Sequence, residues 1–136
     1  MQLTPTIYLP GLVDEAIAFY RTALDIDIQF IRRIEDCIDP RFIQPGTERK
    51  VLRAALRIGQ SVFHLSDGHG TRVPQHDGFS LSLAFPTLPE AERAIDALSE
   101  GGRVLLPLRQ TTWANMYGAV IDRFGLHWTV ETGGII

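Results

Sequence analysis

The stretch W-A-N-M-Y-G-A-V-I-D-R-F-G-L-H-W, from Trp113 to Trp128, decides how the C-terminal part of the chain folds. Its apolar run breaks at Asp122 and resumes at Leu126, which predicts two strands joined by a tight turn. We expect the Asp122 carboxylate to accept backbone N–H groups in the turn, and Gly125 to adopt a positive φ. Trp128 is expected in the core, whereas Trp113 fits either a core position or the wall of a ligand cavity.

Length and composition predict one ordinary globular domain. The chain has 136 residues, of which 45% are hydrophobic, and a formal net charge of −3. No basic run is longer than the pair Arg32-Arg33, so no nucleic-acid surface is expected. The single cysteine, Cys37, excludes an intrachain disulfide and fits a reducing compartment. Without a leader-like N-terminus or a membrane-length apolar run, a cytoplasmic protein with no membrane partner is predicted.

Apolar periodicity predicts two successive series of a strand, a helix and further strands. The first series comprises a strand at 6–9, a helix at 13–24, a strand at 25–34, an irregular mobile loop at 35–50, and a hairpin of strands 51–58 and 61–65. The second series comprises a strand at 79–85, a helix capped by Thr87 with Glu90, a strand at 104–108 and the terminal hairpin.

The order of elements repeats at an offset of 75 residues. Glu15-Ala16 and Glu90-Ala91 occupy equivalent places in the two helices, and the same offset relates Pro5 to Ser80. Such self-similarity between supersecondary units constrains the fold strongly. The sequence therefore predicts an α+β protein of two βαβββ modules, each with a four-stranded, mostly antiparallel sheet and its helix on one face.

Several segments resemble one known family over nearly the whole chain. They are E-A-I-A-F-Y-R-T-A-L from Glu15, A-L-R-I-G-Q-S-V-F-H-L-S-D from Ala55, E-A-E-R-A-I-D-A-L-S-E-G-G-R-V from Glu90, and the Trp113–Trp128 stretch. Together they resemble the PhnB-like branch of the vicinal oxygen chelate (glyoxalase–bleomycin resistance) superfamily. A 3-demethylubiquinone-9 3-methyltransferase label is common in this branch. Here Gly68-His69-Gly70 lies between antiparallel strands, unlike the glycine-rich turn of a dinucleotide-fold methyltransferase.

The resemblance implies the domain architecture and the assembly. It implies a single domain over 1–136, with one module at about 1–67, a linker at about 68–77 and a second module at about 78–136. The eight strands would form a curved half-barrel around a cleft. A homodimer is implied as well, which would cover sheet edges that one chain leaves open.

The resemblance also locates four positions that hold a divalent metal in the superfamily's enzymes. They fall on Pro5, His64, Ser80 (or Ser82 if the register slips by two) and Thr129. Proline offers no donor atom, and hydroxyls are poor ligands for zinc, nickel or iron. No cofactor is therefore predicted, and the alternative is a two-ligand divalent-metal site of His64 and Glu131.

The predicted function is metal-independent binding of a small organic molecule in the cleft, by sequestration or with His64 as a candidate catalytic base. The alternative is a divalent-metal-dependent lyase, isomerase or dioxygenase of the glyoxalase type. His69 and His76 are expected on the solvated surface. The predicted cleft residues are Tyr8, His64, Ser80, Ser82, Arg109, Trp113, Thr129 and Glu131.

Overall fold

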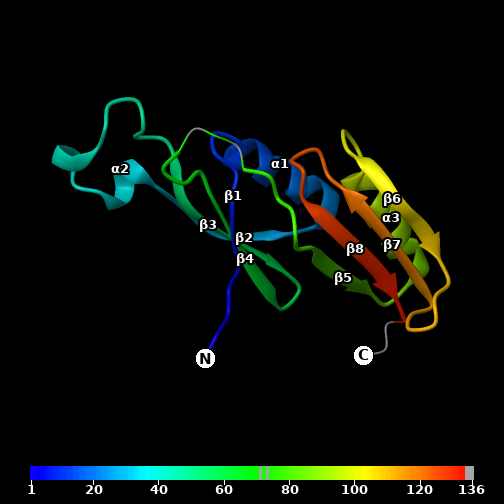
Figure 1. Cartoon of the computed structure of the whole chain (residues 1–136). Coiled ribbons are helices and arrows are strands. Elements are labelled where there is room, and N and C mark those ends of the chain that lie inside the picture. The colour runs from blue at the N-terminus through cyan, green and yellow to red at the C-terminus, as the bar shows by residue number, and fades with distance from the viewer. Residues whose placement is uncertain (71, 73, 134–136) are drawn as a thin grey trace. The chain divides into compact units, whose positions relative to one another are not determined.

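The chain folds into two compact units, Met1–Pro74 and Gln75–Ile136, which are described in turn. The computed structural model describes residues 1–70, 72 and 74–133. Each unit contains one four-stranded mixed sheet and one long helix (Figure 1). The α+β class and the twofold repetition of strand, helix and three strands are therefore confirmed. Within the described ranges, no helix combines the length and the apolar character that a membrane crossing requires.

Unit 1 has the sheet order β1-β4-β3-β2, in which β1 runs parallel to β4 and the other neighbours are antiparallel. The predicted hairpin is present, with the turn at Gly59-Gln60. The elements of this unit are β1 (Thr6–Tyr8), α1 (Val13–Leu24), β2 (Asp27–Arg33), α2 (Ile34–Cys37), the 3-10 turn η1 (Pro40–Phe42), β3 (Val51–Ile58) and β4 (Ser61–Ser66).

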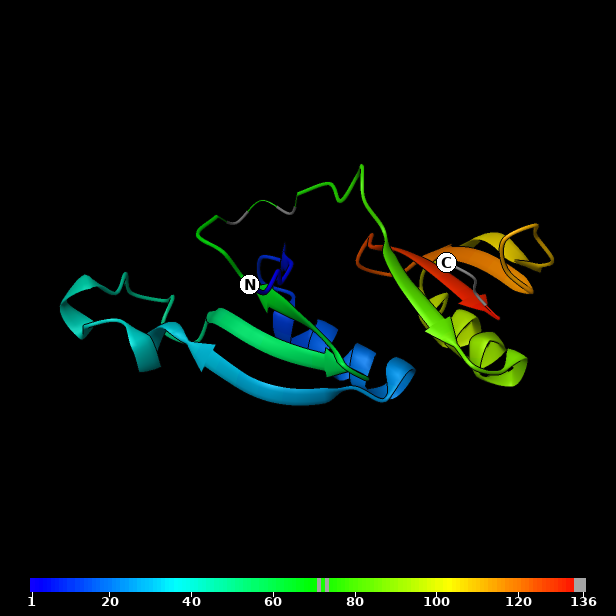
Figure 2. The same ribbon diagram turned by 90° about the horizontal axis from the view of Figure 1, so that it is seen from below.

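Helix α1 covers one face of this sheet, and its apolar stripe forms the core of unit 1 (Figure 2). The Tyr20 ring lies edge-on to Phe63 of β4, with 6.4 Å between centroids, so Phe63 points toward the helix. Side chains alternate along a strand, so His64 and Ser66 point to the opposite face. That helix-free face therefore carries these two polar side chains. The buried residues of α1 are Val13, Ala16, Ile17, Tyr20 and Leu24.

The segment between β2 and β3 extends beyond the ends of these strands (Figure 1). It was predicted as an irregular loop, but it contains α2 and η1. The Asp39 carboxylate accepts the Arg41 N–H at 2.9 Å, and Pro40 occupies the first turn of η1, where its missing N–H costs nothing. Turns this short have no apolar periodicity, which is why the prediction missed them.

Unit 2 repeats the arrangement with the order β5-β8-β7-β6, and β5 runs parallel to β8. Its elements are β5 (Leu81–Phe85), α3 (Leu88–Leu98), β6 (Arg103–Arg109), β7 (Met116–Ile121) and β8 (His127–Thr132). Strands β1 and β5 begin at 6 and 81 and helices α1 and α3 at 13 and 88, so the offset of 75 holds at both starts. Strand β5 begins two residues later than predicted, which leaves Phe79 exposed.

Helix α3 begins at the predicted cap and packs on one face of the second sheet (Figure 2). The Thr87 hydroxyl accepts the Glu90 N–H at 3.4 Å and donates to the Glu90 carboxylate at 2.8 Å. A Cβ on Gly118 of β7 would lie 3.3 Å from Cδ1 of Ile95, so Gly118 faces the helix. By alternation, Tyr117 and Ala119 face away from it.

The turn between β7 and β8 has the predicted chemistry. One Asp122 oxygen accepts the N–H groups of Phe124 at 2.8 Å and Leu126 at 3.0 Å, and the other accepts the Trp128 indole N–H at 2.8 Å. Gly125 adopts a φ of +86°, as expected. Trp128 is 1% exposed and belongs to the core, whereas Trp113 is 51% exposed.

Candidate functional site

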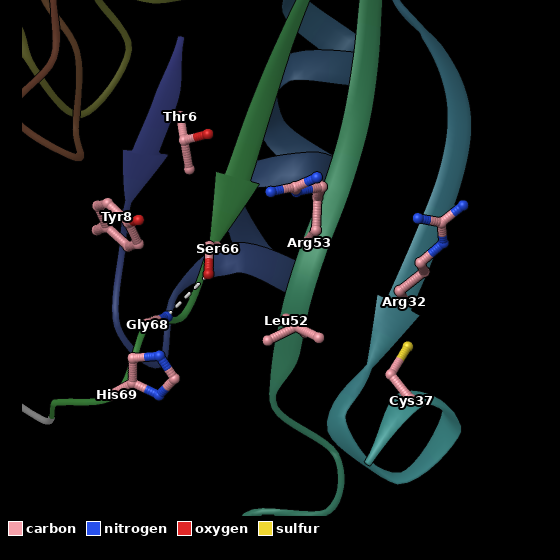
Figure 3. A pocket seen from close by; sticks show the side chains of 9 residues that line it. All are labelled: Thr6, Tyr8, Arg32, Cys37, Leu52, Arg53, Ser66, Gly68 and His69. Atoms are coloured by element: carbon pink, nitrogen blue, oxygen red, sulfur yellow. Dashed lines mark hydrogen bonds between the residues drawn. The ribbon is translucent and has the colours of Figure 1, made fainter. Parts of the chain in front are cut away.

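A pocket of about 410 Å³ opens on the helix-free face of unit 1 (Figure 3). All four strands of the sheet contribute to it, because alternate residues of neighbouring strands meet on one face. We call it the arginine pocket, after the two guanidinium groups in its wall. It is lined by Thr6, Tyr8, Arg32, Cys37, Leu52, Arg53, Ser66, Gly68 and His69.

The rim of the arginine pocket is shaped by the chain that leaves β4. The Gly68 N–H donates to the Ser66 hydroxyl at 3.0 Å, and Gly68 adopts a φ of +64° (Figure 3). A Cβ at this position would lie 3.1 Å from Cδ1 of Tyr8. Glycine therefore allows the chain to turn against the Tyr8 ring, which is half exposed.

Two cations dominate the electrostatics of the arginine pocket. Arg32 and Arg53 are directly opposite each other in the β2–β3 register, and both are exposed. The Arg32 guanidinium lies 4.0 Å from the centroid of the Phe30 ring. Within the described part of the chain, neither arginine forms an ion pair with a carboxylate. The lining residues include no Asp or Glu, so the pocket is positively charged.

His64 lies beside the arginine pocket on the same face of the sheet. It is opposite Thr6 on β1 and Ala55 on β3, and its ring centroid is 6.2 Å from that of Phe30. Partial burial, and secondly the positive charge of Arg53, lower the pKa of His64 below its ordinary value. The imidazole is therefore neutral at pH 7 and can accept a proton.

The residues at the superfamily's metal positions do not fit a metal centre. The residue opposite His64 is Thr6 rather than Pro5. The Pro5 carbonyl instead accepts the backbone N–H of His64 at 2.8 Å. In unit 2, Ser82 is opposite Thr129, and the Thr129 hydroxyl donates to Ser82 Oγ at 2.8 Å. No group of three or more His, Cys, Asp or Glu side chains that could hold a metal occurs among the described residues.

Two further predicted cleft residues of unit 2 lie on its helix-free face. Glu131 and Arg109 lie on either side of Tyr117 in the strand register, so all three point away from α3. The Trp113 ring lies edge-on to Tyr117, with 5.3 Å between centroids. Ser80 precedes β5 and has no partner in the β5–β8 register.

The sequence did not identify most of the arginine pocket, and it predicted only Tyr8 among its lining residues. Arg32 and Arg53 are 21 positions apart in the sequence, and only the strand register brings them together. His69, predicted as solvated surface, is exposed but also lines the pocket. His76 differs from that prediction, because its Nε2 is buried with no hydrogen-bond partner among the described residues, and burial lowers its pKa.

Comparisons with known proteins agree with this architecture. Residues 5–130 match the family described as the Glyoxalase/Bleomycin resistance protein/Dioxygenase superfamily. Protein YjdN of Escherichia coli is 26% identical over 96% of this chain and 95% of its own length. The crystal structure of protein PA1353 from Pseudomonas aeruginosa is 32% identical, covers 97% of both chains and has a TM-score of 0.84. A Bacillus cereus structure described as a putative 3-demethylubiquinone-9 3-methyltransferase, PhnB protein, is 23% identical with a TM-score of 0.76, covering 97% of this chain and 99% of its own.

Proposed function

Because this chain belongs to the Glyoxalase/Bleomycin resistance protein/Dioxygenase superfamily, we propose that it binds a small organic molecule in the arginine pocket without a metal ion. The observation that carries this proposal is the pocket itself. Its volume of about 410 Å³ is in the range of small-molecule sites, which combine an apolar wall with a few converging polar groups. Leu52 and the Tyr8 ring supply the wall, and the two guanidinium groups supply polar anchors.

Independence from metal follows from the donor atoms. Zinc, nickel and iron sites are built from imidazole, thiolate and carboxylate ligands. At the superfamily's metal positions this chain offers one imidazole, His64, beside hydroxyl groups. The Ser82 and Thr129 hydroxyls also bind each other, so the glyoxalase type of metal chemistry has no ligand set here.

His64 gives the proposed site a route to acid–base chemistry. It follows Phe63 on β4 and lies opposite Thr6, which lines the arginine pocket. A bound molecule that reaches one row of side chains along the sheet would meet a neutral imidazole. A proton could then pass from the molecule to His64, while Arg53 disfavours the imidazolium and favours return of the proton. Without such contact, the protein sequesters its ligand.

The assembly that we propose is a homodimer. The outer strands β1 and β2 of the first sheet, and β5 and β6 of the second, have a backbone edge with no strand neighbour in their own sheet. A second copy of the chain would protect such edges from nonspecific pairing. Light scattering at micromolar concentration should give twice the chain mass, and a stable monomer would contradict this assembly.

The test uses Cys37, the only cysteine of the chain, as a reporter at the arginine pocket. A library of small aromatic and carboxylic fragments is screened by thermal shift in EDTA. Fragments that raise the melting temperature should also slow the reaction of Cys37 with a thiol reagent. The matched control is a Cys37→Ser, Ser61→Cys variant, in which the thiol lies in the exposed β3–β4 hairpin and should show no protection.

Two results would overturn the proposal. One is a library in which no fragment both stabilises the protein and protects Cys37. The other is a stoichiometric transition metal in protein purified without a metal-affinity tag, with the metal lost in His64→Ala. The second result would restore the metal-dependent alternative.

A further inference from the structure

A second pocket adjoins the arginine pocket on unit 1. It has a volume of about 310 Å³ and shares Leu52, Gly68 and His69 with the arginine pocket. We call it the isoleucine pocket, since three isoleucines contribute to its wall. Its lining residues are Ile34, Ile38, Phe42, Ile43, Gln44, Thr47, Lys50, Leu52, Gly68 and His69.

The isoleucine pocket exposes apolar surface that the core of unit 1 does not use. Phe42 is 75% exposed and Ile38 is 38% exposed, and both belong to the segment between β2 and β3. Large apolar side chains gathered around a hollow mark a binding surface more often than scattered ones do. The segment between β2 and β3 thus supplies an apolar compartment directly beside a positively charged one.

Both ends of this segment are fixed to the sheet. The Arg33 guanidinium binds Asp14 of α1 at 2.7 Å and donates to the Arg49 carbonyl at 2.8 Å. The Ile34 N–H donates to the Lys50 carbonyl at 2.9 Å. These bonds hold the apolar side chains close to the ends of β2 and β3, beside the arginine pocket.

We propose that the two pockets form one extended site for an amphipathic organic anion, such as a medium-chain carboxylate. The anionic group binds Arg32 and Arg53, and the apolar part crosses Leu52 into the isoleucine pocket. This inference rests on the proposed function and adds the class of ligand. It also assigns a role to the segment between β2 and β3.

The charges favour an anion over a neutral or cationic ligand. Guanidinium groups bind carboxylates through paired N–H donors, and a carboxylate would neutralise cations that lack ion pairs within the described residues. Neither pocket is lined by Asp or Glu, and the isoleucine pocket adds a third cation, Lys50. A cationic ligand would therefore be repelled by both compartments.

The test titrates the isotope-labelled full chain with octanoate, butyrate and octan-1-ol, and follows backbone amide shifts by NMR. Octanoate should perturb amides around both pockets, and butyrate mainly those around Arg53. Affinity should rise about threefold to fourfold for each methylene between butyrate and octanoate. Octan-1-ol should bind at least about tenfold more weakly than octanoate, because it lacks the charge.

Two variants separate the compartments. Arg53→Gln should weaken octanoate binding about tenfold, while Arg21→Gln, on the exposed side of α1, leaves it unchanged. Phe42→Ser should weaken octanoate more than butyrate. Its control is Phe79→Ser, which removes a 44% exposed phenylalanine from unit 2 and should change neither affinity.

The outcomes distinguish the ligand class from the pocket itself. Equal affinities for octanoate and octan-1-ol, no dependence on chain length, or no effect of Arg53→Gln would overturn the amphipathic anion. If uncharged fragments protect Cys37 while octanoate does not, the ligand class is wrong and the arginine pocket remains the binding site. If neither protects it, both proposals fall.

Discussion

The two units of this chain have the same order of elements but carry different chemistry on their helix-free faces. In unit 1 that face presents His64 and a pocket with two cations. In unit 2 the corresponding face contains a closed hydroxyl pair, Ser82 and Thr129, and the aromatic contact between Trp113 and Tyr117. Packing against the helix constrains one face of each sheet in the same way. The other face carries different side chains in the two units, which is where we expect function to differ.

A second comparison concerns one buried carboxylate in each unit. Asp67 is 5% exposed and accepts the N–H groups of Gly11 at 2.8 Å, Val13 at 3.4 Å and Val51 at 2.7 Å. Asp122 is 2% exposed and also accepts three N–H groups, all from the following six residues. Asp67 thus joins segments that are distant in sequence, whereas Asp122 organises a local turn.

The largest expected effect is the removal of either buried carboxylate. Asp122→Ala and Asp67→Ala should each lower the free energy of unfolding by about 3 kcal/mol, because buried N–H groups lose their acceptor. Urea denaturation followed by circular dichroism measures this loss. Asp27→Ala is the control, since its exposed ion pair with Arg57 at 3.0 Å should contribute less than about 1 kcal/mol. A loss below that value at Asp122 or Asp67 would mean that solvent replaces the carboxylate.

A smaller effect is expected where the helices pack on the sheets. Gly118 and Ala54 each point toward the helix from a central strand, opposite Val130 and Leu65. Gly118→Ala should lower the free energy of unfolding by about 1–2 kcal/mol, because the new Cβ would lie 3.0 Å from the Leu106 carbonyl oxygen. Thermal unfolding measures the change. Gly70→Ala is the neutral control, because the nearest described atom outside the adjoining residues would lie 3.9 Å from its Cβ.

Ala54→Gly sharpens the same comparison from the other unit. It should lower the free energy of unfolding by about 1 kcal/mol, because glycine gives the unfolded chain more backbone entropy and a buried methyl group is lost. If Gly118→Ala instead stabilises the protein, β6 can move away from the new methyl group, and the close approach of the Leu106 carbonyl is not a constraint on the fold.

The smallest expected effect is a pH dependence at His64. Its pKa is lower in the folded protein than in the unfolded chain, so the unfolded state binds the proton first as pH falls. Stability should therefore decline as pH drops below about 6.5, and level off below the folded pKa. His64→Gln should remove this part of the decline, while the part from His76, whose pKa is lowered in the same direction, remains.

NMR titration of the His64 ring separates the two causes of its lowered pKa, which are burial and the charge of Arg53. Arg53→Gln should raise the pKa of His64, because a neighbouring positive charge is removed. Arg57→Gln, on the same strand but paired with Asp27, should leave the titration unchanged. An unchanged midpoint in Arg53→Gln would show that burial alone sets the pKa, and would weaken the link between His64 and the arginine pocket.

The sequence was sufficient where structure is encoded locally. The periodicity of α1, the Thr87 cap of α3 and the Asp122 turn depend on residues a few positions apart, and all three were predicted. Phe79 was wrongly placed in a strand. The apolar alternation starts at Phe79, two residues before the pairing of β5 with β8 begins at Leu81. Alternation therefore identifies faces better than it identifies strand ends.

The candidate site depends on register, which alternation does not fix. The β2–β3 pairing shifts between Ile28 and Phe30 and again between Arg32 and Arg33. These register shifts determine which β2 side chain lies opposite Arg53. The residue pattern of β2 does not predict them. The isoleucine pocket was missed for a related reason, since Ile38 and Phe42 lie in turns without periodicity.

Both tryptophans belong to unit 2, and unit 1 has none. Indole emission will therefore follow the melting of unit 2, while far-ultraviolet circular dichroism follows the strands and helices of both units, in a single unmodified sample. Coincident transitions would mean that the two units unfold as one cooperative body. Separate transitions would mean that each unit unfolds independently of the other.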